Sequence, residues 1–167
     1  MPLERYLLIW MCVLIFVNQL GFGSIIPVLP LYAQACGVSA SAVGMTIAIY
    51  GLARFVAALP SGRLCDHLGR RPTLAIGGIL TAIGNLWCAL ATDYSEFLLA
   101  RFVAGLGAGV VVLTGQLVLV DISTPERRGR LLSIYQAAFL FAVGIGPLPG
   151  GLIAQQFGLA APVSYTH

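Results

Sequence analysis

Residues 62–71 read Gly62-Arg63-Leu64-Cys65-Asp66-His67-Leu68-Gly69-Arg70-Arg71, and they separate two long apolar runs, residues 41–64 and 72–91. Each run is long enough to cross a lipid bilayer, because a spanning helix needs about 20 mostly apolar residues. The charged segment leaves room only for a short connection, in which Gly62 and Gly69 suit a tight turn because glycine tolerates positive φ. The segment therefore predicts a hairpin of two membrane-spanning helices.

The same apolar character extends over the whole chain. Hydrophobic residues make up 59% of the 167 residues and charged residues only 9%, whereas a soluble domain normally carries about 25% charged residues. The apolar runs are continuous rather than alternating, which favours helices over a β-barrel. We therefore expect an all-α, polytopic transmembrane helical bundle. Its five spans are expected at residues 6–30, 41–64, 72–91, 95–120 and 125–157, and residues 158–167 would be a truncated tail, either the start of a sixth helix or a foreign end.

The positive charges predict how the helices are oriented in the membrane. All nine basic residues are arginines. Seven of them lie near the N-terminus or in the second and fourth connections, on one side of the membrane, and the other side has none: Arg5, Arg63, Arg70, Arg71, Arg127, Arg128 and Arg130. Arginine-rich short loops stay in the cytoplasm. We expect a multi-pass protein of the plasma (bacterial inner) membrane, with a cytoplasmic N-terminus.

Several classes of function are disfavoured by the residues present. The four cysteines lie more than twenty residues apart, and the chain has two histidines, so no clustered set of metal ligands is expected: Cys12, Cys36, Cys65 and Cys88. No nucleophile, metal ligand set or pair of carboxylates is found at one depth, so we expect neither an enzyme nor a cofactor. The arginines are confined to short connections between apolar runs, which argues against a nucleic-acid partner.

A few polar residues interrupt the apolar runs and are candidates for a substrate path. Arg54 and Arg101 lie inside the second and fourth runs, where a charge is costly and normally faces a cavity or a partner. Snorkelling to the interface is the alternative for Arg101. The uncharged candidates would either line the path or form hydrogen bonds between helices: Asn18, Gln19, Asn85, Gln116 and Gln136.

Three stretches resemble the motifs of the major facilitator superfamily of transporters. Residues 62–71 fit the pattern G-x-x-x-D-x-x-G-R-R and resemble motif A, the gating loop, through Gly62, Asp66, Gly69, Arg70 and Arg71. Residues 101–109 are similar to motif B through Arg101 and Gly105, with Ala104 in place of the usual glutamine. Residues 146–151 are similar to motif C of proton-coupled exporters through Gly146, Pro147, Gly150 and Gly151. Residues 21–30 resemble the tetracycline and drug exporter branch.

This resemblance implies a secondary active transporter built from two six-helix halves that alternate between inward and outward states. The chain would be the N-terminal part, one helix short of a half, and its partner would be the missing C-terminal half. Motif A would act as a cytoplasmic latch, with Asp66 against the other half and Asp121 as the charge partner of the motif's arginines. The motif B arginine, Arg101, is associated with proton transfer in the family.

The resemblance leaves the transported solute and the direction of transport open. Proton-coupled efflux of drug-like or small organic solutes is the first expectation. Asn18, however, stands where related exporters carry an acidic residue, so proton coupling would depend on another part of the protein. Uptake of a sugar or an organic acid is an alternative that motif C disfavours. A non-transporting membrane scaffold or remnant is an alternative of another class, and a reading frame that continues past His167 would argue against it.

Overall fold

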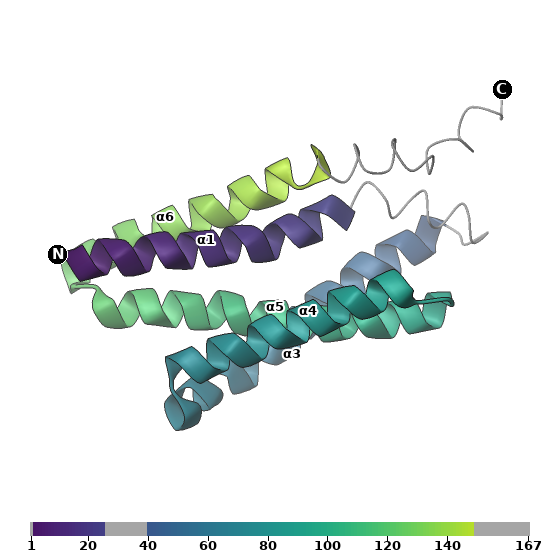
Figure 1. Cartoon of the computed structure of the whole chain (residues 1–167), viewed down its shortest axis with the longest axis horizontal. Coiled ribbons are helices and arrows are strands. Elements are labelled where there is room, and N and C mark those ends of the chain that lie inside the picture. The colour runs from purple at the N-terminus through teal and green to yellow at the C-terminus, as the bar shows by residue number, and fades with distance from the viewer. Residues whose placement is uncertain (1, 26–39, 149–167) are drawn as a thin grey trace.

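The structure, a computed structural model, describes residues 2–25 and 40–148, and these form long helices with short connections (Figure 1). The helices are α1 (Pro2–Ile25), α3 (Ala40–Leu68), α4 (Arg70–Leu90), α5 (Tyr94–Ile122) and α6 (Pro125–Ile145). No strand occurs within the described ranges, and the expected all-α class is confirmed. Residues 26–39, which connect the first two helices, lie outside the described residues, as do Gly150, Gly151 and the tail.

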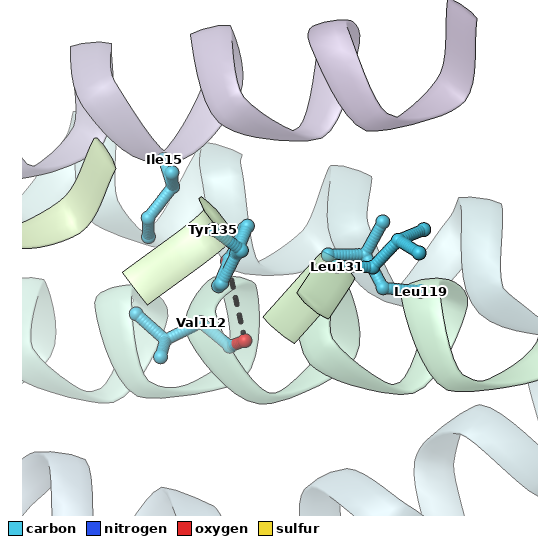
Figure 2. Packing of buried hydrophobic residues seen from close by; sticks show 5 residues of the cluster. All are labelled: Ile15, Val112, Leu119, Leu131 and Tyr135. Atoms are coloured by element: carbon cyan, nitrogen blue, oxygen red, sulfur yellow. Dashed lines mark hydrogen bonds between the residues drawn. The ribbon is translucent and has the colours of Figure 1, made fainter. Parts of the chain in front are cut away.

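Helix α5 holds the bundle together. It packs against α3 and α4 on one side, and the pair formed by α1 and α6 lies along its other side (Figure 1). Side chains from three helices meet in a buried cluster, which contains Ile15 of α1, Val112 and Leu119 of α5, and Leu131 and Tyr135 of α6 (Figure 2). The Tyr135 hydroxyl donates to the Val112 carbonyl at 3.3 Å, so the buried phenol keeps a hydrogen-bond partner (Figure 2).

Four of the described helices are long and apolar enough to cross a membrane, namely α1, α3, α4 and α5. Five membrane spans were expected, and four helices of the described residues qualify as spans. The described part of α6 falls short because its first two turns carry four charged residues: Glu126, Arg127, Arg128 and Arg130. The apolar residues that would complete the predicted span 125–157 extend past Leu148, beyond the described part.

Large apolar side chains cover the outside of these helices. Examples on α1 are Ile9, Val13 and Val17, which lie four residues apart and therefore share one face of the helix. Helices α3 and α4 expose further examples: Phe55, Leu59, Ile79, Ile83, Leu86 and Leu90. So many exposed apolar side chains would drive association in water, whereas they suit a hydrocarbon environment.

The helices extend further than the apolar runs predicted. Helix α3 continues to Leu68 and α5 to Ile122, so Asp66 and Asp121 lie in last helical turns and not in the expected loops. The physical reason is that charge marks where the hydrocarbon ends, while backbone hydrogen bonding continues into the headgroup region. At 29 residues, each of these helices is about 43 Å long, against a hydrocarbon core of about 30 Å.

Candidate functional site

A single residue, Gly69, turns the chain from α3 into α4. Its φ of 89° and ψ of 166° lie in a region that is essentially reserved for glycine. The Gly69 amide donates to the Cys65 carbonyl at 3.0 Å, and its carbonyl accepts the Thr73 hydroxyl at 2.8 Å. The expectation that Gly62 also forms the turn is wrong. Gly62 lies inside α3, because one residue with positive φ is enough to reverse the chain.

Three charged residues form a cluster at this turn. The Arg70 Nε atom donates to Asp121 Oδ2 at 2.8 Å, which joins the start of α4 to the end of α5. The second contact, from Arg70 Nη1 to Asp66 Oδ1, is long at 3.5 Å, and the Asp66 side chain is 75% exposed. Arg71 is exposed and forms no salt bridge with the described residues. Asp66 and Arg71 therefore remain accessible to further contacts, while Arg70 is held.

A second ion pair between helices lies at the same end of the bundle. Arg127 of α6 lies 3.8 Å from Glu4 of α1, measured from Nη1 to Oε2. Hydrogen bonds from its own backbone amide and from the Thr124 hydroxyl lower the pKa of Glu126, so this carboxylate stays charged near the start of α6, where negative charge is favourable. The N-terminus, the α3–α4 turn and the α5–α6 turn all lie at one end (Figure 1).

Glycines bring the helix backbones into close contact along α5 and α6. A Cβ atom placed on Gly105 would lie 2.7 Å from the Tyr50 carbonyl oxygen, so Gly105 lets α3 and α5 approach. A Cβ atom on Gly146 would lie 2.5 Å from the Gly23 Cα atom, so the first glycine of the predicted motif C lies against α1. Such small residues are how membrane helices pack closely. Pro147 follows the end of α6 at Ile145.

Arg101 is completely buried between α1, α3 and α5. Its Cζ atom lies 5.0 Å from the Tyr50 ring centroid, 5.6 Å from that of Phe22 and 6.0 Å from that of Phe97. The Phe22 and Tyr50 rings are themselves stacked at 4.5 Å. None of the Arg101 nitrogens Nε, Nη1 and Nη2 has a hydrogen-bond partner among the described residues. The side chain is 0% exposed, so snorkelling does not occur in this structure.

Arg54 lies midway along α3 and is half-buried. Its Cζ atom lies 5.2 Å from the centroid of the Phe139 ring of α6. A groove of about 610 Å³ runs between α3, α5 and α6, and two of the three predicted glutamines, Gln116 and Gln136, line it. Gly62 lines the same groove.

The remaining predicted polar residues lie elsewhere. Asn18 and Asn85 line a second groove, of about 530 Å³, between α1 and α4. Gln19 is fully buried and donates from Nε2 to Asn18 Oδ1 at 3.4 Å, while its Oε1 atom has no partner in the described part of the chain. Four of the candidate path residues are therefore divided between two grooves, and Gln19 and Arg54 line neither of them.

The sequence reasoning missed the aromatic residues around the two arginines. Phe22, Tyr50, Phe97 and Phe139 look the same in sequence as aromatic residues that face lipid, because all of them lie in apolar runs. One signal was present: Phe97 and Arg101 are four residues apart on one helix and so share a face.

Apolar helices, close-packed seams and charges gathered at one end define this chain as a multi-pass, all-helical membrane protein. The family model of the Major Facilitator Superfamily matches residues 11–165. The chain belongs to this superfamily. The roles assigned to the three motifs stay predictions.

Two curated relatives illustrate the similarity. The chain is 29% identical over 147 residues to an uncharacterised MFS-type transporter of Methanocaldococcus jannaschii, a match that covers 88% of this chain and 38% of the relative. It is 31% identical over 143 residues to the quinolone resistance protein NorA of Staphylococcus aureus, covering 84% of this chain and 36% of NorA. The chain thus spans just over a third of the length of these relatives.

Proposed function

We propose that this chain is the N-terminal part of a secondary active transporter that uses protons to export drug-like or small organic solutes. Its N-terminus would lie in the cytoplasm. The similarity to a quinolone resistance protein supports efflux of such solutes. The single structural observation that carries the proposal is the α3–α4 turn, where Arg70 binds Asp121 at 2.8 Å and Asp66 stays exposed. A second half would supply the rest of the central site and the contact for Asp66.

Proton coupling places a demand on the rest of the protein. All six acidic residues of the sequence lie at helix ends or in connections: Glu4, Asp66, Asp93, Glu96, Asp121 and Glu126. A carrier of protons through the membrane needs a titratable group at depth, and Asn18 does not titrate. We therefore assign the coupling carboxylate to the C-terminal half.

In proteoliposomes that contain the complete protein, a pH gradient is expected to drive solute movement, and its collapse by an ionophore should stop the flux. A solute flux that is independent of the pH gradient would contradict proton coupling.

Replacing Asp66 by asparagine in the complete protein is expected to slow transport at least tenfold. The exposed carboxylate would lose the charge with which it holds the second half, and a tenfold rate change corresponds to about 1.4 kcal/mol. Initial rates of solute efflux from proteoliposomes measure the effect. Asp93→Asn is the matched control, because Asp93 lies in the opposite connection, where asparagine serves equally well before a helix. Equal rates in Asp66→Asn and the wild type would exclude the latch.

A further inference from the structure

We propose that the groove between α3, α5 and α6 binds the acidic group of an amphipathic aromatic organic anion, with Arg54 as the residue that contacts the negative charge. This inference rests on the proposed function, since it names the class of solute that the transporter would carry.

Arg54 and Phe139 do not line the groove themselves, but each lies about one helical turn from a residue that does. Ala58, one turn further along α3, lines the groove, and Gln136, one turn before Phe139 on α6, lines it too. Residues three and four apart on a helix are neighbours on its surface. The Arg54 guanidinium lies 5.2 Å from the centroid of the Phe139 ring. This pair therefore connects α3 and α6 about one turn from the two lining residues.

The Arg54 charge is not neutralised by the described chain. Arg54 forms no hydrogen bond or salt bridge with residues 2–25 or 40–148. No acidic residue of the sequence lies in the middle of a helix. Arg101, the other arginine within an apolar run, lies 5.0 Å from the centroid of the Tyr50 ring, and Tyr50 is four residues from Arg54 on α3. The interior of the described bundle is therefore positive.

An anionic ligand would offset the cost of this arrangement. An arginine in the middle of a membrane helix is costly, and a cation–π contact offsets only part of that cost. The guanidinium presents five N–H donors in a fork that matches a carboxylate. With no hydrogen bond to the described residues, these donors are available to a carboxylate that enters the groove.

The groove also suits the apolar body of such a molecule. Its volume of about 610 Å³ lies in the range of roughly 300–1,000 Å³ that is typical of small-molecule sites. Apolar side chains from two helices form much of its wall: Leu113, Leu117, Val120 and Leu132. Gln116, Gln136, Ser61 and Ser133 add a few polar groups that orient a ligand. This combination fits an aromatic ring with one acidic group better than it fits a sugar.

Two probes that differ by one charge test the proposal, 2-naphthoate and its methyl ester. Calorimetry on the complete protein in detergent should show that 2-naphthoate binds at least tenfold more tightly than the ester. Arg54→Gln should remove this preference and leave binding of the ester unchanged, while Arg54→Lys should retain part of it. Arg128→Gln, which removes an exposed charge of α6, should retain all of it. Thermal melting of each variant verifies that it is folded.

Three results would overturn the proposal. The first is equal affinity of the wild type for both probes, as expected if a carboxylate of the other half already neutralises Arg54. The second is an unchanged preference in Arg54→Gln, and the third is equal weakening of both probes, which indicates a structural role. The proposed function fails separately: a charge preference in binding without any flux in proteoliposomes would refute transport alone, and flux without a charge preference would refute the anion site alone.

Discussion

Replacement of Gly84 by alanine is expected to lower the free energy of unfolding of the complete protein by about 2–3 kcal/mol, near the upper end of the usual cost of overpacking. A Cβ atom on Gly84 would lie 2.6 Å from the Ala104 Cα atom and even closer to the Ala104 amide nitrogen. Carbon atoms pack at about 3.5–4.0 Å, and backbone atoms cannot rotate away as a side chain does. Helices α4 and α5 would have to separate by about 1 Å along their whole seam.

The matched control for this prediction is Gly78→Ala on the same helix. A Cβ atom on Gly78 has nothing within 4 Å, so this variant gains helix propensity, worth up to about 1 kcal/mol, without a clash. A fluorogenic thiol reagent measures both melting temperatures, because Cys65 is buried and reacts on unfolding. Equal melting temperatures in the two variants would show that α4 and α5 do not pack as closely as described here.

Replacement of Gly69 by alanine is expected to cost about 1–3 kcal/mol for backbone strain, because a side chain at φ 89° and ψ 166° clashes with its own backbone. The strain acts one residue before Arg70, so we also expect the contact between Arg70 and Asp121 to weaken. Gly69→Asn should be as unstable as Gly69→Ala. Asparagine tolerates the left-handed helical region, but that region has ψ near 50° and not near 166°.

Gly62→Ala is the control, because Gly62 lies inside α3 and a Cβ atom there has nothing within 4 Å. Its melting temperature should equal or exceed that of the wild type, while both Gly69 variants melt lower and are cleaved faster by protease at the α3–α4 turn. A stable Gly69→Asn would indicate an ordinary left-handed turn and would contradict the extended ψ of this residue.

Much of the fold follows from hydropathy. The continuous apolar runs predicted helices at every place where the structure has one, since the bilayer forces a buried backbone to satisfy its own hydrogen bonds. Hydropathy was less informative about helix ends. Asp66 and Asp121 are charged and were assigned to loops, yet both lie in helical turns that extend past the hydrocarbon. Local composition reports the surrounding solvent, whereas helix ends depend on backbone hydrogen bonds.

The amino-acid sequence was sufficient to define the class of protein, the family and the residues of the charged turn, because these depend on composition and on spacing along one segment. In the hairpin at residues 62–71, a single residue, Gly69, reverses the chain. Arg70 of this hairpin pairs with Asp121, which lies 51 positions further along the sequence. Three arrangements became visible only once the helices were packed: the aromatic rings around Arg101, the pairing of Arg54 with Phe139, and the division of four polar residues between two grooves. Each depends on which faces of two or three helices meet. In lipid, that choice follows from the close fit of small residues such as Gly84 and Gly105, and not from hydrophobicity, which every face of these helices shares.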